Sequence, residues 1–270
     1  MSLITVNEEK CIKCGLCVEE CPALVLKLEP TGPKEVQPNV NGCLECGHCV
    51  AICPKEAIDN NKSPLAMQSE IGEAKKLNAE EAKNFIRARR SIRSYKNTPV
   101  EREKLMELVD VAHLAPTASN SQGISYLIID GKKAIQLAVE ECINWFENDP
   151  TWNNMLAGMI KGYRENKVDT ILRDAPSIIL TLADDDFYHG RENSTISLSY
   201  LELYAPSLGL GSCWAGIFEI CALSENSPMY KIFNIPEKKK ITGTVMVGYP
   251  KYSYKRFTDR QPLSASFYEN

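Results

Sequence analysis

Hydrophobic and polar positions follow two different patterns along this chain of 270 residues. The first sixty residues contain short apolar runs separated by cysteines, glycines and prolines, which predicts turns, short strands and single helical turns. Beyond about residue 84 the apolar positions become periodic over longer stretches, which is typical of regular helices and strands. The pattern therefore predicts a small N-terminal domain at 1–60, a polar linker at 61–83 that is partly helical near its end, and a larger domain at 84–270.

The larger domain contains both helical and strand patterns. A capping box of Thr98 and Glu101, with Pro99 at the first helical position, predicts a helix whose apolar positions recur at helical spacing up to Ala112. Other segments predict helices at 79–90, 132–147 and 194–208 and strands at 124–129, 176–183 and 241–249. Pro206 should kink or end its helix. Helices that alternate with strands indicate a mixed α/β sandwich of the α+β class.

Charge and composition restrict the classes of partner. The formal net charge is −4, so no nucleic-acid surface is expected. No run of 18 apolar residues occurs, so no membrane-spanning helix is expected, and the acidic N-terminus lacks the apolar region of a secretory signal. The high cysteine content, 11 residues, is therefore expected to reflect metal ligands in the cytoplasm rather than disulfides of a secreted protein.

Eight cysteines form two copies of the spacing C-x2-C-x2-C-x3-C-P. The first copy is Cys11, Cys14, Cys17 and Cys21, and the second is Cys43, Cys46, Cys49 and Cys53. This spacing is typical of a protein with two [4Fe–4S] clusters, because each cluster takes four thiolates and one loop supplies three of them. Two zinc sites are the alternative, but zinc favours Cys-x2-Cys pairs separated by a longer gap.

Residues 1–60 resemble the bacterial two-cluster ferredoxins. In these ferredoxins the fourth cysteine of each motif binds the other cluster. The resemblance implies that one cluster is held by Cys11, Cys14, Cys17 and Cys53, and the other by Cys43, Cys46, Cys49 and Cys21. Gly15 and Gly47 occupy the same loop position, where a side chain would displace the backbone. His48, between two ligands, is a candidate for tuning the second cluster, although a solvated loop histidine is the plainer interpretation.

Four further segments lie in a fixed order within the larger domain. They are Arg89-Arg90-Ser91-Ile92-Arg93, Pro116-Thr117-Ala118-Ser119-Asn120, Leu208-Gly209-Leu210-Gly211-Ser212-Cys213-Trp214-Ala215-Gly216, and Gly248-Tyr249-Pro250 followed by Arg260. In this order they resemble the motifs of the FMN-dependent nitroreductase family, over about residues 84–265. The resemblance implies a sandwich of the nitroreductase type that binds FMN and forms a homodimer.

The resemblance also assigns roles to residues. Guanidinium groups bind phosphate through paired hydrogen bonds, so Arg89, Arg90 and Ser91 are expected at the phosphate and ribityl end of FMN, with Arg260 closing on the phosphate. Arg93 should approach the N1/O2 edge of the flavin ring, where a cation stabilises the reduced form. The turn of Ser212, Cys213, Trp214, Ala215 and Gly216 should present backbone N–H groups to O4 and N5. Pro116, Thr117 and Asn120 match the segment that reaches FMN across the dimer interface.

Several residues keep two interpretations. Gly123 stands where the family often has a bulky Pro-Trp pair, which predicts a more open pocket wall. Tyr188 or His189 is a candidate proton donor or part of a solvated loop, and Trp145 and Trp152 stack on substrate or belong to the core. Cys213 is a redox-active or a packing residue, whereas Cys142 and Cys221 are predicted to be buried core thiols. No catalytic residue is identified.

These features together predict an oxidoreductase. A ferredoxin-type donor would pass single electrons through the clusters to FMN, which then reduces a small organic acceptor such as a nitroaromatic, a quinone or an activated alkene. Direct reduction of FMN by NAD(P)H is the second hypothesis. A redox-sensing or electron-transfer partner without its own substrate is the third. The family scaffold alone does not select among them.

Overall fold

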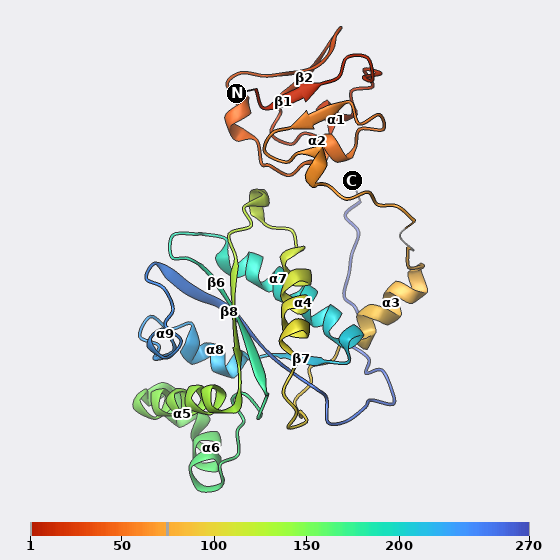
Figure 1. Ribbon diagram of the computed structural model, residues 1–270. Helices are drawn as coiled ribbons and strands as arrows, with labels where there is room; N and C mark the ends of the chain where they lie inside the picture. Colours follow the sequence, from red (N-terminus) through yellow and green to blue (C-terminus); the bar gives the residue numbers. More distant parts are fainter. Residues whose placement is uncertain (1, 74–75, 270) are drawn as a thin grey trace. The chain divides into compact units, whose positions relative to one another are not determined.

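The computed structural model describes residues 2–73 and 76–269. The chain divides into two compact units (Figure 1). The first unit comprises Met1–Lys76 together with Ala118–Ser121, and the second comprises Leu77–Thr117 and Gln122–Asn270. Ala118–Ser121 therefore belongs to the first unit, although the residues before and after it belong to the second.

The first unit is built from two antiparallel strand pairs and short helical turns. Strand β1 (Ile4–Val6) pairs with β4 (Ile58–Asn60), and β2 (Leu26–Glu29) pairs with β3 (Gly32–Glu35). The helical turns are α1 (Leu16–Glu19), α2 (His48–Ala51), η1 (Asn39–Gly42) and η2 (Leu65–Met67). Its buried core contains only a few apolar side chains, among them Leu3, Ile4, Val25, Leu26 and Ile58. So small a core needs the additional stabilisation that bound clusters would supply.

The second unit is organised around an antiparallel four-stranded sheet with the order β5-β6-β8-β7. The strands are β5 (Ser125–Asp130), β6 (Ser177–Asp184), β7 (Gly211–Trp214) and β8 (Lys239–Gly248). All of β6 except Asp184 is buried, because helices cover both faces of the sheet. The sequence predicted three of these strands, and β7 lies inside the segment that was predicted only as a flavin-binding turn.

Helices pack on both faces of this sheet. On one face, α4 (Arg102–His113) and α7 (Gly190–Tyr204) pack on residues such as Ile179 and Val245. On the other, α5 (Lys132–Asn148), α6 (Pro150–Asn166), α8 (Gly216–Ala222) and α9 (Met229–Ile232) surround Ile178 and Met246. Neighbouring strand residues thus face opposite layers, as the pleat requires. The predicted α+β sandwich with a small N-terminal domain is confirmed.

The starts and ends of several helices differ from the sequence prediction. The predicted capping box of Thr98 and Glu101 does not form, and α4 begins at Arg102 with Glu101 as its N-cap. The Glu101 carboxylate instead accepts a hydrogen bond from the Tyr249 hydroxyl, so a tertiary contact replaces the local one. The capping box of this region lies at Asn78 and Glu81, at the start of α3 (Ala79–Ala88).

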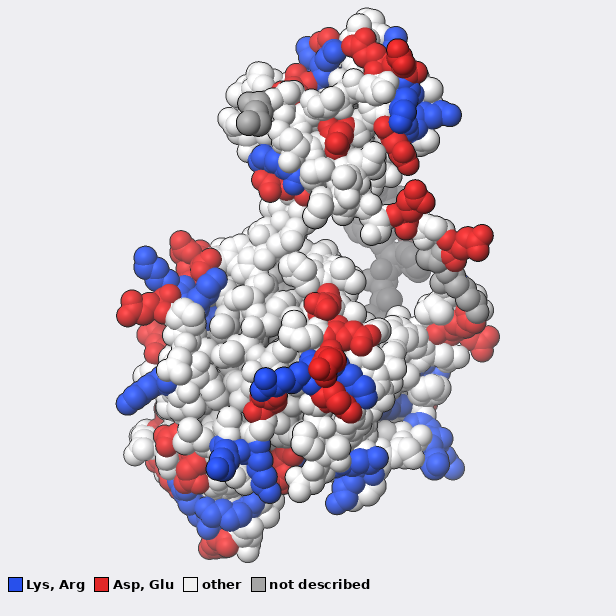
Figure 2. Space-filling model, in the orientation of Figure 1, with Lys and Arg blue, Asp and Glu red and all other residues white. Residues whose placement is uncertain are grey.

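Pro206 does end its helix. Helix α7 stops at Tyr204, and the 3-10 turn η4 (Ala205–Leu208) follows, closed by Gly209 with a φ of 71°. This prediction is confirmed, since proline cannot continue the α-helical hydrogen bonding. Among residues 2–73 and 76–269, no helix is long and apolar enough to cross a bilayer. Basic and acidic side chains are interspersed on the face of the second unit drawn in Figure 2.

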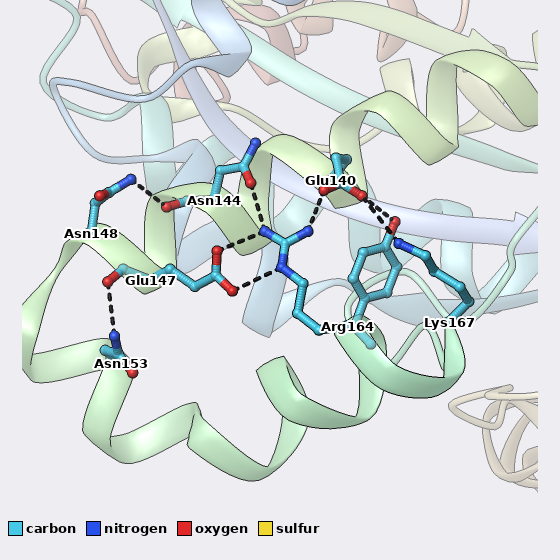
Figure 3. Close-up of polar contacts among 8 residues, drawn as sticks. Glu140, Asn144, Glu147, Asn148, Asn153, Arg164 and Lys167 are labelled. Atoms are coloured by element: carbon cyan, nitrogen blue, oxygen red, sulfur yellow. Dashed lines mark hydrogen bonds and ion pairs between the residues drawn. The ribbon is translucent and has the colours of Figure 1, made fainter.

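Arg164 joins helices α5 and α6 into a hairpin (Figure 3). Its guanidinium donates two hydrogen bonds to the Glu147 carboxylate, at 2.8 and 2.6 Å, one to Asn144 at 2.6 Å and one to Glu140. The hydrogen bonds from Arg164 lower the pKa values of the Glu140 and Glu147 carboxyls below their ordinary value of 4.5. Bidentate pairing of this kind holds two helices in a fixed register.

The Arg164→Met variant is expected to weaken the second unit at neutral pH only. Because the two carboxyl pKa values are lowered on folding, the stabilisation is present above pH 4.5 and is lost as pH falls through the lowered values. Both carboxylates are partly exposed, so about 1–2 kcal/mol and a Tm decrease of about 3–6 °C are expected. Thermal unfolding of wild type and variant at pH 7 and pH 3 measures this; an equal difference at both pH values would contradict it.

Candidate cluster and flavin sites

The first cysteine quartet lines a single cavity. Cys11, Cys14 and Cys17 surround it together with Cys53, which comes from the second half of the repeat. Burial is the main cause that raises the pKa of the Cys17 thiol to about 11, and the nearby thiols of Cys49, Cys53 and Cys14 contribute to the increase. Metal ligation requires the thiolate, so this set fits a cluster whose iron replaces the thiol protons.

Residues of the second quartet also lie close to the fourth cysteine of the other motif. Burial raises the pKa of Cys49, and the proximity of Cys21 and Cys46 adds to the shift. Cys21 comes from the first half of the repeat, so these side chains lie together as the exchanged fourth ligand requires. In residues 2–73 and 76–269, no group of three or more His, Cys, Asp or Glu side chains is arranged to hold a single metal ion.

Asn60 is a polar residue at the second quartet that sequence reasoning missed. Its side chain is buried, and Nδ2 lies 3.8 Å from Sγ of Cys43 and 3.9 Å from Sγ of Cys49. In the sequence it is an asparagine seven residues after Cys53, and this spacing matches no known motif. His48, which the sequence singled out, is 63% exposed and lies 3.4 Å from the Glu20 carboxylate.

The flavin motifs of the second unit meet along the edge of the sheet. The segment that begins at Ser91 lies beside β7, where the Ile92 N–H donates to the Ser212 carbonyl at 2.9 Å. Farther along, the Lys96 N–H donates to the Tyr249 carbonyl at 2.8 Å. Three motifs that are far apart in the sequence are therefore held together by backbone hydrogen bonds.

Two motif glycines allow this close approach. A Cβ added at Gly211 would lie 2.4 Å from Cγ1 and 2.9 Å from Cβ of Ile92. A Cβ added at Gly248 would lie 2.6 Å from Pro176 and 2.8 Å from the Tyr95 ring. Contacts below 3.0 Å require the backbone to shift, so both motifs need glycine for packing rather than for a special φ.

The four predicted phosphate and flavin arginines have different surroundings. Arg89 lies 4.0 Å from the Glu202 carboxylate, whereas the Arg90 guanidinium donates to Thr258 Oγ1 at 3.0 Å and to the Arg256 carbonyl at 3.3 Å. Arg93 is exposed beside Cys213, and Arg260 lies in the exposed C-terminal tail. Arg89 thus faces α7, Arg90 contacts the C-terminal segment, and Arg93 lies beside β7.

Glu202 of α7 is a second residue that sequence reasoning missed. Burial raises the pKa of its carboxyl, and Arg89 and the Ser212 hydroxyl, which donates at 3.2 Å, oppose that shift. A buried carboxylate at this position compensates Arg89 in the absence of another anion. An incoming phosphate would compete with it for the same guanidinium.

The turn after β7 presents fewer N–H groups than expected. The Ala215 N–H donates to the Thr244 carbonyl at 3.0 Å, so it is not available to a ligand, while Gly216 begins α8. The Trp214 ring receives the Arg191 guanidinium at 5.1 Å. Arg191 also donates to Glu219, which accepts the Thr244 N–H at 2.7 Å. Glu219 thus joins helix α8 to strand β8, beside the turn.

The predicted segment Pro116, Thr117 and Asn120 is divided between the two units. Thr117 belongs to the second unit, and its hydroxyl accepts the Gln122 N–H at 3.0 Å. Asn120 belongs to the first unit, and its side-chain amide donates to the Leu44 carbonyl at 3.0 Å. Ser119 has a φ of 52° and Gln122 one of 48°, so this short segment carries backbone strain.

The residues with two interpretations mostly have structural roles. Cys142 and Cys221 are fully buried, as predicted, and Cys213 is 5% exposed. Both Trp145 and Trp152 pack edge-on against the core residue Phe146. Tyr188 is 85% exposed and packs edge-on against the His189 ring. The Phe187 ring would lie 3.1 Å from a Cβ at Gly123, so an aromatic side chain occupies the wall that was expected to be open.

A cavity of about 690 Å³ lies beside the motif residues. Most of its charged lining residues are basic, namely Arg90, Lys96, Lys251, Lys255 and Arg256, and the lining also includes Glu202 and Ser212. The volume is that of a small-molecule site, and the basic lining suits a phosphorylated ligand.

Comparison with known protein families gives two matches. Residues 86–249 match the nitroreductase family, and residues 3–54 match a 4Fe-4S dicluster domain. The chain belongs to the nitroreductase family. It is an oxidoreductase of that family with an N-terminal ferredoxin-like domain, as the sequence motifs predicted.

Two related proteins and one solved structure are similar to this chain. An iodotyrosine deiodinase from Thermotoga neapolitana is 24% identical over 62% of this chain and 87% of its own length. A putative NADH dehydrogenase/NAD(P)H nitroreductase from Methanothermobacter thermautotrophicus is 22% identical over 66% of this chain and 81% of its own length. The crystal structure of a Bacteroides fragilis nitroreductase with bound FMN covers 69% of this chain and 98% of its own, with 17% identity and a TM-score of 0.58. The likeness to the solved structure shows a shared nitroreductase fold.

Proposed function

We propose that this nitroreductase-family protein carries single electrons from a ferredoxin-type donor through two [4Fe–4S] clusters to FMN, and then reduces a small organic acceptor. The observation that supports the proposal is the combination of an eight-cysteine cluster domain and a flavin-type scaffold in one chain. Nitroaromatics, quinones and activated alkenes are the proposed acceptors. The proposed location is the cytoplasm, where cysteine ligands stay reduced.

FMN is the proposed flavin, because the relative from Bacteroides fragilis was solved with bound FMN. The cavity fits this choice, since Arg90, Lys255 and Arg256 would hold the phosphate and Ser212 lines the same cavity. Arg89, Ser91 and Arg260 are further proposed phosphate and ribityl contacts. Arg93 would stabilise negative charge at the N1/O2 edge. FMN supplies the conversion between one-electron and two-electron transfer.

The remaining proposed contacts come from the turn after β7 and from the middle of the chain. Cys213, Trp214, Ala215 and Gly216 would line the flavin ring with side chains and backbone atoms other than the Ala215 N–H. Pro116, Thr117 and Asn120 would act from the partner subunit of a homodimer. Light scattering of the holoprotein tests the dimer, and a monomeric mass would remove this part of the proposal.

Stopped-flow absorbance of the anaerobic holoprotein tests the electron path. Reduced ferredoxin is expected to bleach the cluster absorbance first and the flavin absorbance afterwards, and an added quinone should restore both. NAD(P)H that bleaches the flavin at the same rate in protein without clusters would favour direct reduction. A flavin that is bleached but not reoxidised by any acceptor class would favour a partner protein without its own substrate.

A further inference from the structure

The two cluster sites are not equivalent, although their cysteine motifs are. Each cysteine of the first quartet has its counterpart 32 residues later in the chain. Asn60, at the end of β4, therefore corresponds to Leu28 of β2. A polar amide thus stands at the second site where an apolar side chain stands at the first.

The Asn60 side chain is aimed at the sulfurs of the second site. Its Nδ2 lies 3.8 Å from Cys43 Sγ and 3.9 Å from Cys49 Sγ. The residue is 2% exposed, so water does not compete for this donor. The long N···S distances are those of hydrogen bonds to sulfur, which is a large and weak acceptor.

The orientation of this amide is fixed by the backbone. The Lys62 N–H donates to Asn60 Oδ1 at 3.0 Å, and an amide oxygen accepts whereas the NH2 group only donates. The oxygen must therefore face Lys62, which leaves the NH2 group directed at Cys43 and Cys49. The Asn60 backbone is held as well, because it pairs with Ile4 of β1.

Leu28 cannot play the same role at the first site. Its Cδ2 atom lies 3.5 Å from the position of a Cβ at Gly15, so it packs against the first cysteine loop as its place in the repeat requires. A leucine side chain has no donor. Leu28 is also 46% exposed, whereas Asn60 is buried.

A hydrogen-bond donor affects the two redox states of a cluster differently. Reduction adds negative charge that is shared by the sulfurs, so an N–H directed at them stabilises the reduced state more than the oxidised state. The contact gains strength from burial, because little solvent screens it. Each such donor therefore raises the reduction potential of its own cluster. The first quartet has a backbone donor, since the Ala57 N–H donates to Cys53 Sγ at 3.2 Å, and Asn60 supplies a side-chain donor to the second.

We infer that Asn60 is a positioning and tuning residue that raises the reduction potential of the cluster held by Cys43, Cys46, Cys49 and Cys21. The inference rests on the two clusters of the proposed function.

The test is a redox titration of the anaerobic holoprotein followed by EPR. Wild type is compared with Asn60→Leu, which copies the first site, and Asn60→Asp, which keeps the Oδ1 acceptor for Lys62 but removes the NH2 donor. In both variants the potential of one cluster is expected to fall while the other stays unchanged. The equilibrium constant for reduction of that cluster is expected to fall roughly tenfold, which corresponds to a potential lower by about 59 mV for a one-electron couple.

Asn61→Leu is the matched control. The Asn61 amide donates to the Ser2 carbonyl and not to sulfur, so both potentials should keep their wild-type values. Iron and sulfide analysis is made on the wild type and on each variant. A wild type without clusters would contradict the proposed function, whereas a variant without its second cluster is replaced by a measurement on the wild type. Unchanged potentials in fully loaded Asn60 variants would overturn the inference.

A measurement on the wild type covers the case in which neither variant retains the second cluster. Protein labelled with amide-15N asparagine is fully reduced, so that both clusters carry an electron, and is examined by pulsed EPR. A coupling to asparagine nitrogen is the expected result. Its absence from the spectrum of the reduced protein would overturn the inference.

Discussion

Cys46→Ala is expected to remove the second cluster and to stop electron entry from a ferredoxin donor. The flavin reduction rate with reduced ferredoxin should fall about 100-fold or more, because a missing ligand costs more than the 10–100-fold typical of residues that only support ligands. The first unit should also lose stability, since Cys21 and Cys53 each belong to the opposite half of the repeat. Anaerobic stopped-flow absorbance and iron analysis measure the two effects.

Cys142→Ala is the matched control for this variant. Cys142 is a fully buried thiol of the second unit and lines neither cluster site. Its replacement should leave the iron content and the rate of ferredoxin-driven reduction close to wild type. A Cys46→Ala protein with the full iron content, or with an unchanged reduction rate, would contradict the assignment of the second quartet.

Gly211→Val is expected to disrupt the flavin site from within the sheet. Even a Cβ at this position would lie 2.4 Å from Ile92 Cγ1, and valine adds two methyl groups. The segment of Arg89, Arg90, Ser91 and Arg93 must then move away from β7. Strain that raises the free energy of the FMN-binding conformation by about 3 kcal/mol would decrease FMN affinity roughly 100-fold. Fluorescence titration of the apoprotein with FMN measures the change.

Gly158→Ala provides the control for adding a side chain at a glycine. Gly158 lies within α6, where nothing lies within 4 Å of an added Cβ. Alanine has a higher helix propensity than glycine. The free energy of unfolding of this variant should therefore be higher by about 1 kcal/mol, with unchanged FMN affinity. Wild-type FMN affinity in Gly211→Val would show that the contact between β7 and Ile92 does not organise the site.

The sequence was most informative where chemistry demands a fixed local spacing. The Cys-x2-Cys-x2-Cys motifs predicted both cysteine quartets, because one loop must supply three ligands to a cluster. The long apolar run of β6 likewise predicted a strand covered on both faces. Pro206 marked the end of α7, since its effect on the backbone is independent of tertiary contacts.

The sequence was least informative where distant residues decide the outcome. The capping box at Thr98 failed because Glu101 contacts Tyr249, which lies 148 residues away. Asn60, Glu202 and Glu219 were missed because each matters only through partners brought together by folding. The Ala215 N–H was expected at the flavin but bonds to Thr244 of the adjacent strand. Such contacts have no local sequence pattern.

Metal and flavin analysis of protein purified without air tests the central claim most directly. The account predicts about eight iron atoms and eight sulfides per chain, from two [4Fe–4S] clusters, together with one FMN and no zinc. The visible spectrum should show a broad brown absorption beneath the flavin bands. Zinc in place of iron, or a colourless protein that binds no added FMN, would contradict the account.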